Sequence, residues 1–204
     1  MFEPDGFLGV DLGIVNIATT SDGQIMAGRR PNRYRQRHRD LRAKLQKKRT
    51  KSAKRALKRL RRREALHAAN TNHIIAKKIV ATAERTSRGI ALEDLGGIRQ
   101  RVTAGKDQRA RLHSWAFAQL GAFVEYKARR AGVPVVHVDP RNTSRQCSEC
   151  RHTHRSNRVT QARFVCRSCG TVMHADHNGS RNIAHRGEAV WKRGAVNRPG
   201  TSPR

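Results

Sequence analysis

All four cysteines of this chain lie in one stretch, in two pairs separated by fifteen residues. The pairs are Cys147-x-x-Cys150 and Cys166-x-x-Cys169. This spacing is typical of a four-cysteine zinc site, in which each C-x-x-C turn directs two thiolates at one tetrahedral ion. Because all four ligands are thiolates and no coordination position is left for a substrate, we predict a structural zinc ribbon over residues 143–173.

The charge of the chain indicates a polyanionic partner. Its 204 residues carry 44 Lys and Arg against 15 Asp and Glu, a formal net charge of +29. Such an excess repels itself, and nucleic acid is its natural counterpart. An acidic membrane surface is the alternative, but the sequence shows no long apolar run and no lipidation signal. The N-terminus, MFEPDGFLGVDLG, lacks the regions of a secretory signal, so we expect a reducing, cytoplasmic setting in which disulfides are disfavoured.

Three acidic residues occupy unusual positions. Asp11 lies inside an apolar strand between Gly9 and Gly13, where an unpaired carboxylate is costly to bury. Glu93 ends a short apolar run, and Asp176 follows the last cysteine by seven residues. The alternatives are ordinary ones, namely turn residues for the first two and a helix cap, shared with Asn178, for the third.

The order of elements predicts an α/β fold with an RNase H-like mixed sheet. Three strands form an antiparallel meander, and helices and strands alternate after it. This fold brings the three acidic residues to one edge of the sheet, where their mutual repulsion favours binding of divalent cations. The expected elements are strands at 7–12, 14–20 and 24–27, a helical segment at 29–85, a strand at 88–95, a helix at 111–130, a strand at 135–138, the inserted ribbon and a short last helix. The expected domains are an RNase H-like core over residues 1–142, the ribbon over 143–173, the last acidic motif and helix over 174–186, and a disordered basic tail over 187–204.

The helical segment is the most basic part of the chain. Residues 29–63 contain nineteen Lys or Arg and one acidic residue, Asp40, while apolar residues recur at spacings of three and four. This pattern predicts a long helix, or a helical hairpin broken near residues 50–52, with a broad cationic face. A solvated surface is the alternative, but charges of one sign repel each other, so we favour contact with nucleic acid phosphates. The expected contact residues are Arg33, Arg35, Arg37, Arg42, Lys44, Lys47, Lys48, Lys51, Lys54, Arg55 and Arg59.

Five segments, in order, resemble one known family. They are GVDLGIVNIATTSDG, ALEDLGG, VDPRNTSRQCSEC, QARFVCRSCG and ADHNGSRNIA. Together they resemble the RuvC-type nuclease and zinc-ribbon half of the TnpB (OrfB) proteins of small bacterial insertion sequences, which are related to type V CRISPR effector nucleases. The resemblance covers about residues 8–186. It implies a nucleoid-associated bacterial protein that cleaves DNA at sites chosen by a bound guide RNA. It further implies zinc on Cys147, Cys150, Cys166 and Cys169, and catalytic Mg²⁺ on Asp11, Glu93 and Asp176.

The mechanism that fits these residues is hydrolysis of a phosphodiester by two Mg²⁺ ions about 4 Å apart. His174 and His177 flank Asp176 and are candidates for supporting hydrogen bonds or phosphate contacts. In the family, a region that holds guide RNA precedes the nuclease half, whereas here Met1 lies ten residues before Asp11. We therefore expect a full-length relative or another chain to supply that region.

Two other functions fit part of the sequence. One is a nucleic-acid-binding remnant or regulator without turnover, which the short N-terminus favours and the retained acidic residues disfavour. The other is a transposase that joins DNA strands with a related acidic triad. The position of the ribbon before Asp176 argues against strand transfer.

Overall fold

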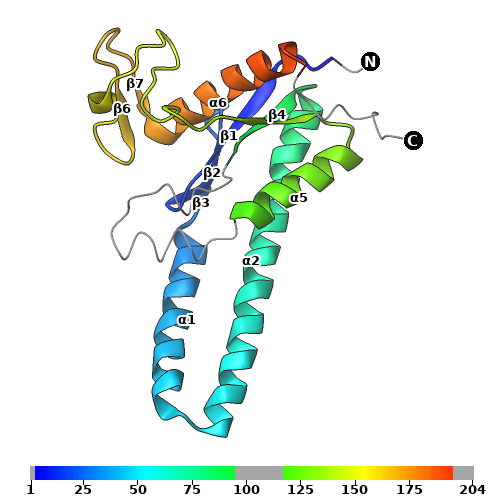
Figure 1. The fold of residues 1–204 in the computed structure, drawn as a ribbon, viewed down its shortest axis with the longest axis vertical. Helices are drawn as coiled ribbons and strands as arrows, with labels where there is room; N and C mark the ends of the chain where they lie inside the picture. The colour runs from blue at the N-terminus through cyan, green and yellow to red at the C-terminus, as the bar shows by residue number, and fades with distance from the viewer. Residues whose placement is uncertain (1–2, 95–116, 195–204) are drawn as a thin grey trace.

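A computed structural model describes residues 3–94 and 117–194, and a mixed five-stranded sheet lies at its centre (Figure 1). The strand order is β3-β2-β1-β4-β5. The first three strands pair antiparallel, which confirms the expected meander, and the last two run parallel to β1. The strands are β1 (Phe7–Leu12), β2 (Asn16–Thr20), β3 (Ile25–Ala27), β4 (Gly89–Glu93) and β5 (Val135–Val138).

Helices cover both faces of the sheet and make a three-layered α/β structure. Helix α5 (Phe117–Arg130) and the C-terminal half of α2 (Lys51–Arg85) pack on one face, and α6 (Ala175–Lys192) packs on the other (Figure 1). The expected start of the helix before α5, at residue 111, lies outside the described residues. No helix in the described ranges combines the length and the apolar character needed to cross a bilayer.

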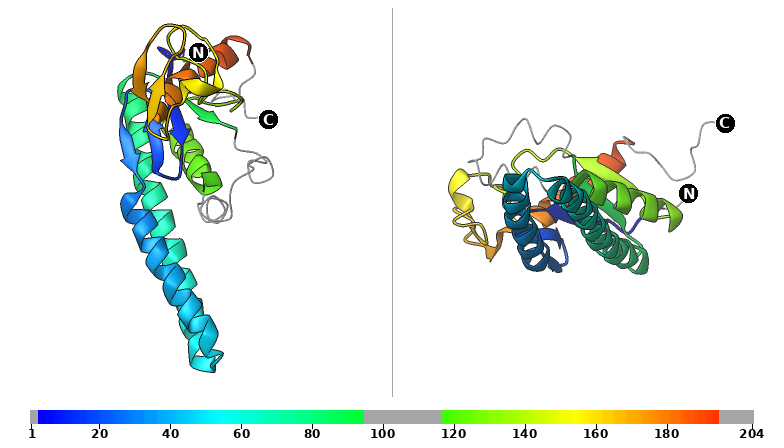
Figure 2. Two further views of the ribbon diagram at one scale, coloured as in Figure 1. Left: turned by 90° about the vertical axis from the view of Figure 1, so that its left-hand side faces the viewer. Right: turned by 90° about the horizontal axis from the view of Figure 1, so that it is seen from below.

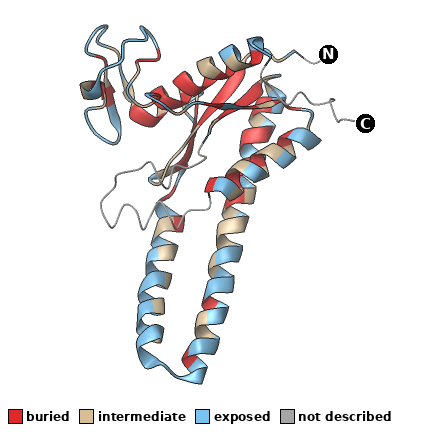
Figure 3. Ribbon diagram, in the orientation of Figure 1, coloured by how far each residue is buried: buried red, intermediate tan, exposed pale blue. Residues whose placement is uncertain are grey.

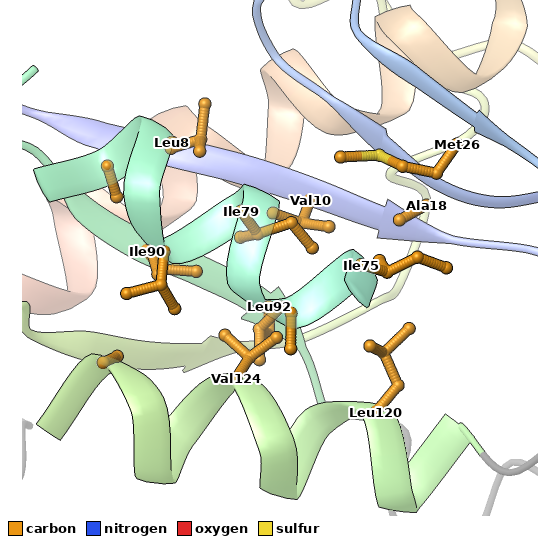
Figure 4. Packing of buried hydrophobic residues seen from close by; sticks show 14 of the residues in the cluster. Leu8, Val10, Ala18, Met26, Ile75, Ile79, Ile90, Leu92, Leu120 and Val124 are labelled. Carbon is orange, nitrogen blue, oxygen red and sulfur yellow. The ribbon is translucent and has the colours of Figure 1, made fainter. Parts of the chain in front are cut away.

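The main core lies between the sheet, α2 and α5 (Figure 4). Side chains from alternate positions of β1 and β4 meet the apolar stripe of α2, whose members recur three to four residues apart. This core explains why the basic helical segment, so polar elsewhere, stays attached to the sheet. Its labelled members are Leu8, Val10, Ala18, Met26, Ile75, Ile79, Ile90, Leu92, Leu120 and Val124.

The basic segment is a helical hairpin, formed by α1 (Arg29–Lys48) and α2, that projects from the sheet (Figure 2). Its turn lies at Arg49, in the left-handed conformation with φ of 50°, and Thr50, whose side chain caps α2 by accepting from the Ala53 amide. The predicted break near residues 50–52 is therefore confirmed. Most of the projecting surface is exposed (Figure 3). Arg42 joins the two helices because its guanidinium contacts both carboxylate oxygens of Glu64, at 2.8 and 2.6 Å.

Helix α6 approaches β1 closely because Gly9 has no side chain. A Cβ at this position would lie 2.0 Å from the Ser180 carbonyl oxygen, so only glycine fits there. The helix continues to Lys192, which corrects the expected boundary between helix and tail at residue 187. The reason is tertiary packing, since Trp191 is 7% exposed, contacts Phe7 and donates to Glu3 at 2.9 Å. Residues 195–204 of the expected tail lie outside the described residues.

The cysteine ribbon (residues 143–173) forms a separate small layer beside the start of α6. Its strands, β6 (Arg163–Val165) and β7 (Val172–His174), pair antiparallel, and a 3-10 turn, η1 (Arg155–Asn157), precedes them. Phe164 is fully buried beside Cys147 and Cys166. The ribbon thus has its own small core, centred on the cysteines.

Candidate functional site: an acidic cluster beside a cysteine ribbon

Asp11 and Glu93 lie on neighbouring parallel strands, at the same edge of the sheet. The register pairs Val10 with Leu92, so the two acidic residues follow side by side near the carboxyl ends of β1 and β4. This edge is where open α/β sheets place ligands and catalytic groups. The sheet therefore brings together the first two predicted site residues.

Asp176 reaches the same edge from α6. It lies in the first turn of that helix, is 7% exposed, and stands next to β1 because α6 packs directly on that strand. The helix cap is the ring of His174, whose Nδ1 accepts from the Asp176 amide at 3.2 Å. Neither Asp176 nor Asn178 caps the helix, so the alternative interpretation of these two residues as helix caps is wrong. A carboxylate in the first helical turn is also favoured by the helix dipole.

Glu93 and Asp176 lie close enough to Asp11 to affect its carboxylate electrostatically. The pKa of Asp11 is raised well above its usual value, first by burial and then by the negative charges of Glu93 and Asp176, while Arg158 acts in the opposite direction. Burial also raises the pKa of Glu93. Two neighbouring acids whose ionised forms are destabilised in this way favour a cation beside them.

Two side chains from outside α6 hold Asp176. Asn16 Nδ2, on β2, donates to Asp176 Oδ2 at 2.9 Å, and Arg158, in the cysteine ribbon, donates to Oδ1 at 3.0 Å. The Arg158 side chain is 24% exposed and the Asp176 side chain 10%, so this ion pair is largely shielded from solvent. Sequence reasoning missed both partners, because Arg158 lies among several other basic residues and Asn16 lies in a strand.

Glu93 is held by Thr143, a third residue that the sequence analysis did not single out. Thr143 Oγ1 donates to Glu93 Oε1 at 2.6 Å. This bond and the charge of Arg186 lower the pKa of Glu93, against the effect of burial. Thr143 comes from the segment that leads into the ribbon, so ribbon residues contact two of the three acids.

Asp11 lies against α6 at Gly179. A Cβ on Gly179 would stand 3.0 Å from Asp11 Oδ2, which is a tight contact. The space around the Asp11 carboxylate is therefore kept by the absence of a side chain at residue 179.

His177, the other predicted supporting histidine, points away from the acids, because its Nε2 lies 3.0 Å from the Ser21 carbonyl oxygen.

The four cysteine sulfurs converge on one point. All four lie within 4.8 Å of one another, with 3.7 Å between Cys147 and Cys169 and 3.5 Å between Cys150 and Cys166. A tetrahedral ion with metal–sulfur bonds of about 2.3 Å separates its sulfurs by about 3.8 Å, whereas a disulfide bond measures about 2 Å. The residues therefore fit one metal ion. Within the described ranges no other group of three or more candidate ligands is this compact, the three carboxylates included.

The thiols differ in their acidity. Hydrogen bonds from Thr171 lower the pKa of the exposed Cys169 to about 6, and burial raises the pKa of Cys147 to about 11. A thiol must lose its proton to bind a metal, so Cys169 is ready to bind at neutral pH while Cys147 depends on the ion to ionise it.

The predicted nucleic-acid contacts lie on the hairpin, and nine of the eleven are exposed. Arg35 and Arg42 are half-buried between the helices. Burial lowers the pKa of Arg35 to about 10, although Glu64 opposes this effect. The structure thus gives Arg42 a role in joining the helices and leaves the remaining exposed side chains available to a polyanion.

Comparisons with known proteins link the chain to one group of nucleases. The family model "Cas12f1-like, TNB domain" matches residues 117–183. The chain is 41% identical over 116 residues to "CRISPR-associated endodeoxyribonuclease Cas12f1" of Sulfoacidibacillus thermotolerans, an alignment that covers 56% of this chain and 26% of the relative. It is 28% identical over 201 residues to "Putative RNA-guided DNA endonuclease InsQ" of Escherichia coli (strain K12), covering 90% of this chain and 49% of the relative.

Solved structures with the same fold come from the same group. A cryo-EM structure of a Cas12f1-sgRNA-target DNA complex matches with a TM-score of 0.70 at 18% identity, covering 89% of this chain and 50% of the other. The chain thus spans half or less of the length of these relatives.

Proposed function

Because this chain belongs to the TnpB family, we propose that it is a DNA endonuclease with an RNase H-like, RuvC-type fold and that Asp11, Glu93 and Asp176 form its active site. The observation that carries the proposal is the meeting of these three carboxylates, from two strands and one helix, at one edge of the sheet. The strand order, with three antiparallel strands followed by two parallel ones, supports the fold assignment.

We propose Mg²⁺ as the ion held by the acids, because hard divalent cations take carboxylate oxygens and keep water ligands. When bound, Mg²⁺ activates water and stabilises the leaving oxygen of a phosphodiester. The protein's own residues prepare the site for it. Thr143 orients Glu93, Asn16 orients Asp176, and the missing side chain at Gly179 leaves room for Asp11.

The second metal is zinc on the four cysteines, where it serves a structural role. Four thiolates close the coordination sphere of a tetrahedral ion and leave no site for a substrate. The sulfur separations support this assignment, because they match a tetrahedral site and exceed a disulfide bond. Zinc would then hold the ribbon in the shape that presents Arg158 and Thr143 to the acids.

DNA and a guide RNA are the proposed partners. The relatives include a protein named as RNA-guided and a structure solved with guide RNA and target DNA. On this chain, the net charge of +29 and the exposed cations of the hairpin fit binding to phosphate backbones. The hairpin offers charge but no arrangement specific for bases, so it would track the backbone.

Binding without cleavage is the second candidate function. It is favoured by one observation, namely that Asn16 and Arg158 already occupy both oxygens of Asp176. If these contacts persist when nucleic acid binds, the carboxylate is not free to take a metal ligand role.

Cleavage of labelled single-stranded and double-stranded DNA separates these functions. The purified chain is tested with Mg²⁺ and with EDTA, with and without the RNA that copurifies with it. We expect Mg²⁺-dependent cutting that is lost in Asp176→Asn and kept in Asp40→Asn, which alters an exposed acid on the hairpin. Equal cutting by Asp176→Asn would contradict the proposed site. Tight, salt-dependent binding without cutting would support the second function, and joined strands among the products would indicate a transposase.

A further inference from the structure

Three side chains on one face of α6 form hydrogen bonds with residues 139–148, called here the leading segment, which runs from the end of β5 into the first part of the cysteine ribbon. Asn178, Asn182 and Arg186 are spaced four residues apart, so they line one side of the helix. Asn178 Nδ2 donates to the Gln146 carbonyl oxygen at 2.7 Å, and Asn178 Oδ1 accepts from the Ser148 amide at 2.9 Å. The leading segment is therefore fixed to the helix that carries Asp176.

The other two side chains continue this attachment. Asn182, which is fully buried, donates to the carbonyl oxygens of Thr143 and Gln146, at 2.9 and 2.7 Å. Arg186 donates to the carbonyl oxygens of Asp139 and Arg141, at 2.6 and 2.7 Å. The backbone of Thr143 is held at its carbonyl oxygen, which limits where its side chain can point.

The Thr143 hydroxyl points at the acidic cluster. The residue is 4% exposed, and its Oγ1 lies 2.6 Å from Glu93 Oε1 and 3.0 Å from the Pro140 carbonyl oxygen. The hydroxyl has one hydrogen to donate. It is donated to Glu93, because that contact is the shorter one and an ionisable carboxylate is a stronger acceptor than a carbonyl oxygen. Glu93 has a long side chain on the last residue of a strand, so without this bond its carboxylate would sample several rotamers.

We propose that Thr143 is a positioning residue that fixes the Glu93 carboxylate for divalent cation binding, and that the cysteine ribbon acts on the acidic site through it. This inference rests on the proposed function of Asp11, Glu93 and Asp176 as cation ligands. It assigns the ribbon a part in assembling the site, because the same segment carries Thr143 into the cluster and continues to Cys147. Residues that orient metal ligands in this way typically change metal affinity by about 10- to 100-fold when they are mutated.

Binding of Mn²⁺ to the full chain, followed by electron paramagnetic resonance, tests the proposal without relying on DNA cleavage. Thr143→Val keeps the shape of the side chain and removes the hydroxyl, and Thr143→Ser keeps the hydroxyl. We expect Thr143→Val to weaken Mn²⁺ binding by about 10- to 100-fold and Thr143→Ser to stay close to the unmodified protein. The matched control is Thr71→Val, which removes a hydroxyl that bonds the His67 carbonyl oxygen within α2.

Zinc content and thermal stability of each variant are measured alongside. Unchanged Mn²⁺ binding in Thr143→Val, equal weakening in Thr143→Ser, or loss of zinc from Thr143→Val would each overturn the proposal, the last because it would assign Thr143 to ribbon folding. If Thr143→Val does not fold well enough to measure, a Thr143→Ala variant is compared in the native and Glu93→Gln backgrounds. We expect the loss to vanish in the Glu93→Gln background, and an equal loss in both would contradict the inference.

Failure of the proposed function gives a different result. If Asp11→Asn leaves Mn²⁺ binding unchanged, the acidic residues are not cation ligands and the proposed function itself falls. If Asp11→Asn abolishes Mn²⁺ binding while Thr143→Val does not affect it, only the inference about Thr143 is wrong.

Discussion

The guanidinium of Arg158 lies 3.0 Å from Oδ1 of Asp176, so the ribbon contributes a positive charge to the acidic cluster of the sheet edge. The two residues are eighteen positions apart and belong to different layers of the molecule. The charge of Arg158 also lowers the pKa of Asp11, against the effects of burial, Glu93 and Asp176. A cation entering the cluster would therefore compete with Arg158 for Asp176.

Replacing Arg158 is expected to strengthen cation binding. In Arg158→Gln the competing charge is gone, so Mn²⁺ affinity should rise about fivefold, which corresponds to about 1 kcal/mol. Isothermal titration calorimetry at low salt measures the change. Arg155→Gln is the matched control, since Arg155 is an exposed cation of the same ribbon. Weaker Mn²⁺ binding in Arg158→Gln would show that the arginine organises the site more than it competes.

The raised pKa of Asp11 predicts a pH-dependent stability. Because the folded-state pKa lies above the unfolded value near 3.8, this residue favours the folded state at low pH, and that contribution is lost as the pH rises through the folded-state pKa. At neutral pH without divalent cations, Asp11→Asn should therefore raise the Tm, by about 2 to 4 °C for each kcal/mol relieved. The gain should shrink as the pH falls toward the unfolded value.

Adding Mn²⁺ should make the Tm of the native chain higher than that of Asp11→Asn. The native chain gains stability from an ion bound among the acids, while Asp11→Asn gains little. Differential scanning calorimetry from pH 4 to pH 8, with and without Mn²⁺, provides the measurement. A Tm that is lower in Asp11→Asn than in the native chain, at neutral pH and without metal, would contradict the electrostatic argument.

The cysteines should differ in reactivity once metal is removed. With its pKa at about 6, Cys169 is mainly a thiolate at neutral pH, whereas Cys147, with its pKa at about 11, is protonated and buried. Alkylation of the chelated protein by iodoacetamide at pH 7, followed by mass spectrometry, should label Cys169 first and Cys147 last. Zinc should protect all four. Equal labelling rates would indicate that the ribbon unfolds when the metal leaves.

Gly179 offers a test of the space around Asp11. A methyl group at this position would stand 3.0 Å from Asp11 Oδ2, so Gly179→Ala should weaken Mn²⁺ binding, by about tenfold if the carboxylate is displaced. Gly121→Ala is the control, because a Cβ at that position of α5 meets no atom within 4 Å. The control should bind Mn²⁺ normally and gain about 0.5 to 1 kcal/mol of stability from its better helix propensity. Normal binding by Gly179→Ala would show that the cluster tolerates the added methyl group.

The cations at the end of the hairpin should account for part of the salt dependence of nucleic acid binding. Each phosphate contact that is lost lowers the slope of log affinity against log salt by about 0.7 to 0.9. Replacing Lys47, Lys48, Lys51 and Lys54 with Gln should lower that slope, as measured by fluorescence anisotropy with labelled DNA and RNA. A control with Arg129→Gln and Arg130→Gln changes two exposed cations of α5. An equal loss per charge in both proteins would indicate a general charge effect without a hairpin site.

The sequence predicted those parts of the fold that depend on local patterns. Buried apolar runs predicted β1 and β5 with correct bounds, and the polar residues at Thr50 and Ser52 marked the turn of the hairpin. The second strand starts at Asn16, two residues later than expected, because the Ile14 and Val15 carbonyl oxygens bond to Asn32 and Gly28 outside the sheet.

The errors and omissions come from contacts between distant segments. The last helix continues past Gly187 because that residue packs against Ala91 of β4, where a side chain would collide. The local composition after Gly187, taken alone, predicts a polar tail. The roles of Thr143 and Arg158 could not be predicted either, because they depend on how the ribbon folds back over the sheet edge. The clustering of the three acids followed from element order, and their catalytic role stays a prediction.

Helix α2 joins the exposed, basic end of the hairpin to the buried, apolar core of the sheet. Its first turns form the exposed end of the hairpin, and its last turns carry Ile75, Ile79 and Ala83 in the sheet core. Its 35 residues, about 52 Å of helix at 1.5 Å per residue, include no proline or glycine. A polyanion bound at the hairpin end would therefore contact the same continuous helix that packs beneath β4, the strand that ends in Glu93.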